Sequence, residues 1–277
     1  MADNGYFERR PLDSRKVKPR KINFKFGDDI PKLWLNNSIV MTHFFNGVNL
    51  YLPAFESFMV RVIQQKLPSV QSEHLKQQIR GFIGQEISHG QTHHKYNQVL
   101  ERQGYKFKTY LKCADFVFAE LLEKKLGANM SLATIAGFEH LTAMLTDIAL
   151  NQNALKDSTP IMKDLWGWHA AEEVEHQHLA FELLQTVNNS YWLRILGIIL
   201  GAMIIVGFTF SGMFVLAFQE RGFISRLTLV DLYNLLLGKH QLVFNGLKLI
   251  FSYFSKHDIP PHNKSRYFAE KVFTSVS

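Results

Sequence analysis

The sequence has little of what holds many small proteins and cofactor sites together. A single cysteine, Cys113, stands among 277 residues, which excludes a disulfide scaffold and any zinc or iron–sulfur site built from several thiolates. Only 8 prolines and 17 glycines occur in a chain that is 47% hydrophobic, so collagen-like and disordered compositions are excluded as well. A metal ion in this protein would therefore be bound by histidine and carboxylate.

Several functional motifs are also missing. The chain shows no flavin, haem or dinucleotide motif, and residues 1–21 lack the apolar core of a signal peptide, so we do not expect export. Residues 9–25 carry eight Lys or Arg against one Asp. This basic stretch is interpreted as a solvated arm, with a patch for anionic lipid as the alternative. Nucleic acid is not expected as a partner, because no nucleic-acid-binding module accompanies the stretch.

Helical periodicity dominates residues 38–188, and no alternating strand pattern competes with it. Caps and breakers predict long helices at about 38–67, 72–104, 131–155 and 159–188, with a shorter helix at about 111–126. The predicted fold class is therefore all-α.

Each of the four long segments has one glutamate near the middle of its apolar stripe. These residues are Glu56, Glu86, Glu139 and Glu173. An ionised carboxylate in an apolar interior is very costly unless it is compensated, and four facing one core would repel each other. Two divalent metal ions would balance the four negative charges.

Histidines extend two of these stripes. Glu86 with His89 and Glu173 with His176 form Glu-x-x-His, which places both side chains on one helix face. One Glu from each of two helices and Glu-x-x-His from each of two others is the di-metal arrangement of ferritin-like bundles. We therefore expect a ferritin-like four-helix bundle with a long crossover, followed by C-terminal apolar helices. The predicted domains are a basic arm (1–37), a di-metal bundle (38–190) and an apolar, membrane-associated tail (191–277).

Two further histidines lie on the ligand faces. His93 and His169 should approach the site from the same end, one as a seventh ligand and the other as a proton donor or an orienting partner. The alternative is that both are hydrogen-bonded core residues. Glu172 borders the ligand face and is a candidate for orienting a ligand histidine.

Other acidic and histidine residues nearby are expected to lie off the site. Glu175 and His178 also spell Glu-x-x-His, but their stripe is polar and is expected to be solvated. His94 and His140 point away from the ligand faces, so we expect surface or packing roles for them.

The tail contains a run of 24 residues without charge, 195–218, which is long enough to cross a bilayer. Tyr191 and Trp192 precede it as an interfacial pair would, with Arg194 beside them. The alternative is a helix buried in the bundle. Residues 227–254 are amphipathic and fit an interfacial or packing helix. We expect membrane contact at the cytoplasmic face of the inner membrane, with a cytoplasmic protein as the alternative.

The segments PAFESF, GQEISHGQTHH and WHAAEEVEHQHLAFE resemble the bacterial family labelled predicted metal-dependent hydrolases, over most of the chain. The ligand pattern is also similar to that of the di-iron arylamine N-oxygenases of the ferritin-like superfamily. That resemblance implies seven metal ligands: Glu56, Glu86, His89, Glu139, His169, Glu173 and His176. His93 and the apolar tail depart from the oxygenase pattern, so its substrate class does not carry over.

Carboxylates with a few imidazoles suit iron or manganese. We expect two iron ions, with manganese or a mixed pair as alternatives. The first functional hypothesis is O₂ activation followed by oxidation of a hydrophobic or lipid-like substrate. The second is a metal-dependent hydrolase that uses a water activated by two metals. The third is a non-catalytic metal-binding or membrane scaffold protein. The sequence names neither the substrate nor an electron donor.

Overall fold

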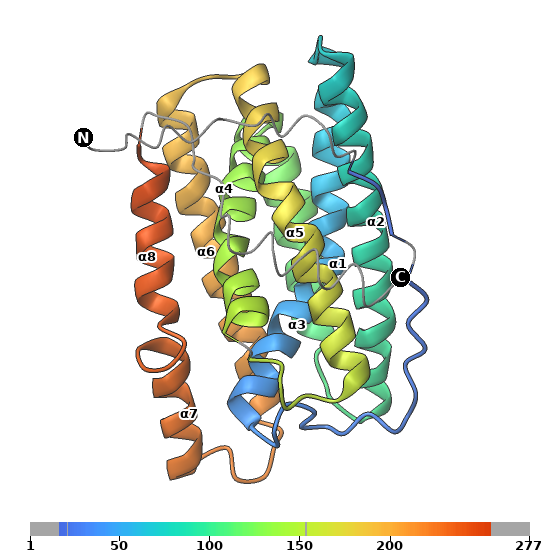
Figure 1. Cartoon of the computed structure of the whole chain (residues 1–277), viewed down its shortest axis with the longest axis vertical. Helices are drawn as coiled ribbons and strands as arrows, with labels where there is room; N and C mark the ends of the chain where they lie inside the picture. The colour runs from blue at the N-terminus through green and yellow to red at the C-terminus, as the bar shows by residue number, and fades with distance from the viewer. Residues whose placement is uncertain (1–16, 21, 153, 256–277) are drawn as a thin grey trace, which may run out of the picture.

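The computed structural model describes residues 17–20, 22–152 and 154–255, which are mostly helical (Figure 1). The four long helices are α1 (Ile39–Lys66), α2 (Glu73–Arg102), α4 (Ala128–Thr146) and α5 (Pro160–Val187). A short 3₁₀ turn, η1 (Leu67–Ser69), follows α1, while α3 (Lys108–Asp115) and the π-helix η2 (Phe116–Lys125) form the crossover, and the π-helix η3 (Asp147–Asn151) extends α4. The remaining helices are α6 (Tyr191–Ala217), α7 (Arg226–Leu236) and α8 (Leu242–Tyr253). The all-α prediction is confirmed, since the only extended pairing in the described ranges is an isolated Leu35–Ser158 bridge.

The long helices begin close to where the sequence places their caps. The hydroxyls of Ser38 and Ser72 accept hydrogen bonds from the backbone N–H groups of Met41 and Leu75. Pro160 occupies the first turn of α5, where its missing N–H costs nothing. The expected third helix begins three residues early, at Ala128, because Gly127 with φ of +77° ends the crossover just before it. Its regular α-helical part also ends at Thr146 rather than near residue 155, because the chain continues as a π-helix.

The bundle is built from two helix pairs. Helix α1 packs against α2, and α4 packs against α5, while contacts of α1 with α4 and of α2 with α5 close the bundle. The long connection predicted between α2 and α4 is itself helical, through α3 and η2. Helix α6 lies against α1 and α4, so one face of the bundle is covered by the apolar tail.

Helix α6 approaches its neighbours through glycines. A Cβ on Gly197 would lie 2.3 Å from the carbonyl oxygen of Ala133, and one on Gly201 would lie 2.7 Å from the backbone nitrogen of Phe138. Two glycines that are four residues apart permit this close helix–helix contact. The same helix is long and apolar enough to cross a membrane, but 39% of its most apolar 18-residue window is buried inside the molecule. A core helix passes the same test of length and apolarity.

Arg194, which was expected to flank the uncharged run 195–218, has a different role. Arg194 is buried, and its guanidinium donates to the backbone carbonyl oxygens of Tyr253 and Ser255. The hydroxyl of Tyr191 donates to the carbonyl oxygen of Phe254 at 3.0 Å. Both residues therefore attach α6 to the end of α8, and only Trp192 of the three points into solvent, with 73% of its surface exposed.

The described part of the basic arm lies on the bundle. Val17 donates its backbone N–H to the side chain of Gln78 at 2.8 Å. Glycines in α2 make room for the arm, since a Cβ on Gly81 would lie 2.0 Å from the carbonyl oxygen of Val17 and one on Gly84 would lie 2.4 Å from Pro19. A solvated arm is therefore wrong for residues 17–20, although Lys18 remains exposed. Residues 9–16 and 21 lie outside the described ranges.

We predict opposite effects for the same substitution at two glycines of α6. Gly197→Ala should lower the free energy of unfolding by about 1–3 kcal/mol, because the new methyl group meets the backbone of α4. Gly207→Ala should raise it by up to about 1 kcal/mol, because no atom lies within 4 Å and alanine favours the helix. Denaturant unfolding of the purified full chain measures both. Equal effects would show that α6 does not pack on α4 as described.

Candidate metal centre

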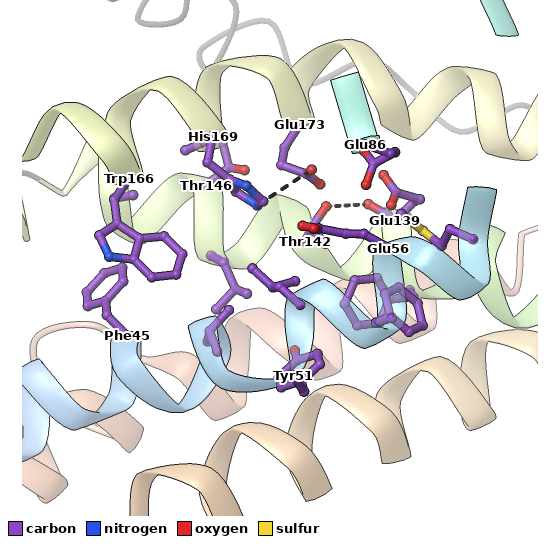
Figure 2. A pocket seen from close by; sticks show the side chains of 18 residues that line it. Phe45, Tyr51, Glu56, Glu86, Glu139, Thr142, Thr146, Trp166, His169 and Glu173 are labelled. Carbon is purple, nitrogen blue, oxygen red and sulfur yellow. Dashed lines mark hydrogen bonds and ion pairs between the residues drawn. The ribbon is translucent and has the colours of Figure 1, made fainter. Parts of the chain in front are cut away.

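The structure brings all seven residues of the expected ligand set together in the middle of the bundle. They form two groups, and within each group the candidate ligand atoms lie within 4.8 Å of one another. The first group is Glu56, His89 and His169, and the second is Glu86, Glu139, Glu173 and His176. All seven side chains are buried, and they come from α1, α2, α4 and α5. Figure 2 shows five of them, Glu56, Glu86, Glu139, His169 and Glu173.

The carboxylates of this cluster lack the partners that buried charges need. Fifteen buried side-chain atoms in the described ranges have no hydrogen-bond partner, and eight of them belong to the cluster. These eight are both oxygens of Glu56, Glu86 and Glu139, one oxygen of Glu173, and Nδ1 of His89. Of these, Oε1 of Glu86 nevertheless forms an ion pair with Nδ1 of His176 at 2.8 Å, which is short enough for a hydrogen bond. Oxygens and an imidazole nitrogen that converge with so few donors and acceptors fit a site for cations. The donor set therefore fits two metal ions.

Burial and mutual repulsion perturb the protonation of this cluster. Burial, and then the charges of Glu86 and Glu173, raise the pKa of Glu56 well above its usual value. Burial and the charge of Glu173 do the same to the pKa of Glu139. Without a metal ion, these two carboxyls keep their protons at pH values where an exposed glutamate is ionised.

The opposite happens around His176. Its Nδ1 lies 2.8 Å from Oε1 of Glu86 and 3.2 Å from Oε1 of Glu173. Although burial acts to lower it, the pKa of His176 is raised well above its usual value by Glu86 and Glu173. Burial acts to raise the pKa of Glu173, but His176 and the other imidazoles lower it to about 2. A proton on Nδ1 thus occupies the place that suits a metal cation.

Two of the candidate ligand histidines are held by their outer nitrogens. His89 donates from Nε2 to Oε2 of Glu172 at 3.0 Å, which leaves Nδ1 free to face Glu86 and Glu173. His176 donates from Nε2 to Oε1 of Gln85 at 2.8 Å. The amide of Gln85 is fixed in this orientation because its nitrogen donates to the carboxylate of Glu175 and to the carbonyl of Lys18. Such outer hydrogen bonds set the tautomer and the ring orientation of a metal ligand.

The third histidine is held by a chain of side chains. Asn49 donates from Nδ2 to Oδ1 of Asn97 at 2.7 Å, so its Oδ1 faces Nδ1 of His93 at 2.6 Å. His93 must then donate from Nδ1, and its Nε2 accepts from Nδ1 of His169 at 3.0 Å. Burial lowers the pKa of His169 to about 3 and that of His93 well below its usual value, so both rings are neutral. Nε2 of His169 therefore carries a lone pair directed toward Glu173, 3.6 Å away (Figure 2).

These contacts show where the two further candidates, Glu172 and His93, lie in the site. Glu172 contacts His89, as the orienting role requires, and its other oxygen accepts from Arg20 at 3.0 Å. Burial acts to raise the pKa of Glu172, but the hydrogen bonds from His89 and Arg20 lower it. His93 lies behind His169 and does not line the cavity of the site, so it fits the orienting role rather than that of a proton donor.

The face of α5 that was expected to be solvated is covered in part. Glu175 binds Arg20 through both oxygens, at 2.9 and 3.0 Å, and also accepts from Gln85. The prediction for this residue is therefore wrong, because the N-terminal segment lies over it. His94 is exposed, and His140 is buried and donates to the carbonyl oxygen of Leu249 at 3.1 Å.

A small apolar cavity adjoins the cluster. It offers about 30 Å³ to water-sized molecules. Its lining includes all four glutamates and His169 together with aromatic and aliphatic side chains (Figure 2). No lysine or arginine is part of this lining. The space suits water or another very small molecule, so an organic substrate requires the walls to move.

Sequence reasoning missed four side chains that support the ligands: Arg20, Asn49, Gln85 and Asn97. Asn49 and Asn97 carried a weak signal, because each is a polar residue within an apolar helical stripe. Gln85 and Arg20 carried none, since their partners lie far away in the sequence.

Removing the carboxylate behind His89 should weaken metal binding. We predict that Glu172→Leu lowers metal affinity by about 10–100-fold, because His89 loses the acceptor that orients it. Glu182→Leu on the same helix is the matched control, since Glu182 is exposed. Competition with a chromophoric chelator measures both affinities. Equal affinities in the two variants would contradict the role of Glu172.

Metal binding should also release protons. Metal ions compete with the protons held by Glu56, Glu139 and His176, so affinity should rise with pH. Titration calorimetry in buffers of different ionisation enthalpy measures the number of protons released. Glu139→Gln should release fewer, and an affinity independent of pH would contradict this prediction.

Comparisons with known proteins agree with this geometry at the level of the family. No curated protein and no solved structure matches the chain. A family model described as "Predicted metal-dependent hydrolase" matches residues 18–263, which include every residue of the buried cluster and its supporting contacts. The chain therefore belongs to the family of predicted metal-dependent hydrolases.

Proposed function

We propose that this protein is a di-metal hydrolase that acts on an apolar substrate. The observation that carries the proposal is the cluster of four buried glutamates and three histidines on the wall of an apolar cavity. The family description favours hydrolysis over the other reaction classes. Two divalent ions in such a site lower the pKa of a bound water and polarise a carbonyl or phosphoryl oxygen.

The chain supplies binding, orientation and exclusion of water. Glu56, Glu173 and His169 line the cavity and face the space where a reacting group would enter. The apolar walls, which include Phe45 and Trp166, would bind the hydrocarbon part of a substrate and keep bulk water out. The hydrogen bonds behind the three histidines hold their inner ring nitrogens toward the centre of the site.

A second candidate is oxidation of an apolar substrate with O₂. The size and the apolar lining of the cavity favour it, since a small apolar molecule fits there without rearrangement. A donor set of four carboxylates and three imidazoles also suits iron or manganese. This candidate requires an external electron donor.

We predict that the purified chain binds about two transition-metal ions, as the paired Glu-x-x-His arrangement does in related bundles. Glu86→Ala should abolish this di-metal site, because it removes a carboxylate that faces His176. Glu101→Ala on the same helix should not, since Glu101 is exposed. Elemental analysis after reconstitution measures metal content. A folded chain without bound metal would contradict the proposal.

The two reaction classes respond differently to oxygen. For a hydrolase, cleavage of long-chain acyl or phosphoryl esters should proceed without O₂, with zinc or manganese in place of iron. For an oxidase, the iron-loaded chain should change its ultraviolet–visible spectrum on exposure to O₂ and consume it. Ester cleavage that persists anaerobically and is lost in Glu86→Ala supports hydrolysis. An O₂-dependent spectrum without ester cleavage overturns it in favour of oxidation.

A further inference from the structure

Most of the exposed large apolar side chains gather on the three C-terminal helices. Sixteen of the twenty such side chains in the described ranges lie between Trp192 and Phe251. Surface apolar residues are usually scattered, and a concentration of this kind marks an interaction site. We name the outward side of α6, α7 and α8 the apolar face. Its principal residues are Trp192, Leu196, Ile199, Met203, Val206, Leu227, Leu229, Tyr233, Phe244, Leu247 and Phe251.

The apolar face follows helical periodicity. On α6, the exposed residues from Trp192 to Val206 are spaced by four, three, four and three positions, which places them along one side of the helix. Phe244, Leu247 and Phe251 form a similar stripe on α8. Helix α8 contacts α4, α6 and α7, and the C-terminal helices lie along one side of the bundle (Figure 1).

The charges around this face have one sign. Between residues 191 and 255, the exposed charged side chains are Arg221, Arg226, Lys239 and Lys248. The two acidic residues of the same stretch are engaged, since Glu220 accepts from Tyr105 and Asp231 accepts from Ser38. A second copy of the chain would place these basic groups on a face that carries no exposed acid. An anionic lipid surface matches both the apolar area and the charge.

The contacts of α6 determine how it would meet a bilayer. Its inward side is packed on α4 through Gly197 and Gly201, at distances that leave no room for a Cβ, and on α1 through Gly212, where a Cβ would lie 3.1 Å from the backbone of Gly47. Crossing the bilayer would detach this side and uncover both partners. The helix therefore meets lipid with one side while the other stays on the bundle.

We propose that the apolar face is a docking surface for an anionic lipid bilayer, against which α6, α7 and α8 lie in the plane of the interface. Trp192 and Tyr233 suit the interfacial region, where aromatic rings are favoured. The four basic side chains meet the headgroups. No helix of the described chain spans the bilayer in this arrangement.

Docking brings lipid near the cavity of the metal centre. Nδ1 of His240, between α7 and α8, lies 2.7 Å from Oε1 of Gln152 at the end of η3. A Cβ on Gly246 of α8 would lie 3.3 Å from the sulfur of Met144. Three of the next residues of α4 and η3, Leu145, Thr146 and Ala149, help to line the cavity. A lipid-derived substrate would reach the site along this route, a step that rests on the proposed function, whereas docking does not.

Vesicle flotation of the full-length chain tests docking without any measurement of activity. The chain should float with phosphatidylcholine vesicles that contain phosphatidylglycerol, and about tenfold less with phosphatidylcholine alone. Phe244→Glu with Phe251→Glu should abolish flotation. Ile87→Glu is the matched control, because Ile87 is an apolar residue with 44% of its surface exposed. It lies on α2, which does not pack against α6, α7 or α8. Circular dichroism and thermal unfolding check that each variant folds.

Tryptophan fluorescence reports docking on the bilayer at a single residue, Trp192. Trp192 is 73% exposed, whereas Trp34, Trp166 and Trp168 are at most 4% exposed. Anionic vesicles should shift the emission to shorter wavelength, brominated lipids should quench it, and Trp192→Phe should remove both effects. A carbonate wash should release the bound chain, as expected for docking in the plane.

Four outcomes would overturn the proposal. The first is that the chain does not float with anionic vesicles, and the second is that Ile87→Glu loses flotation as fully as the Phe244→Glu, Phe251→Glu variant. The third is that the chain stays on the membrane after the carbonate wash, because such retention indicates a spanning helix. The fourth is a dimer in light scattering that dissociates in the Phe244→Glu, Phe251→Glu variant, which assigns the face to a second copy. If the chain floats with anionic vesicles but shows no metal-dependent activity, only the proposed function is contradicted, and docking stands.

Discussion

Four glutamates buried against one another are the constraint on which the rest of the bundle depends. Each comes from a different helix, and no lysine or arginine lines the space between them. Hydrocarbon packing alone would not hold four such groups at close range, because unpaired buried carboxylates strongly oppose folding. Protons on Glu56 and Glu139 and on His176 reduce the charge in the metal-free chain. The same groups are the candidate ligands for the cations that would replace those protons.

The support around the cluster is as specific as the cluster itself. Each ligand histidine has a different outer partner: a carboxylate for His89, an amide for His176, and a second imidazole for His169. These partners make the two halves of the site chemically distinct. One group has a single carboxylate with two imidazoles, and the other has three carboxylates with one imidazole. The two positions therefore differ in charge and in basicity.

The helices and the glutamates could be predicted because both follow a single period along the chain. Residues such as Glu56 and Glu86 are recognisable as exceptions within an apolar stripe. Arg20 could not be placed, since it meets Glu172 across 152 residues and lies in a segment without periodicity. The apolar run of α6 was ambiguous for a different reason. Its glycine side packs on α1 and α4 while its opposite side is exposed, and a hydropathy pattern does not separate two apolar sides.

The contact of Arg20 with α5 has a consequence for biosynthesis. Arg20 is synthesised before its partners Glu172 and Glu175, which follow about 150 residues later. The last candidate ligand, His176, follows immediately after them. The segment that carries Arg20 therefore cannot take its final place until α5 has emerged. Docking of Arg20 is a closing step of assembly, and it couples completion of α5 to the orientation of His89.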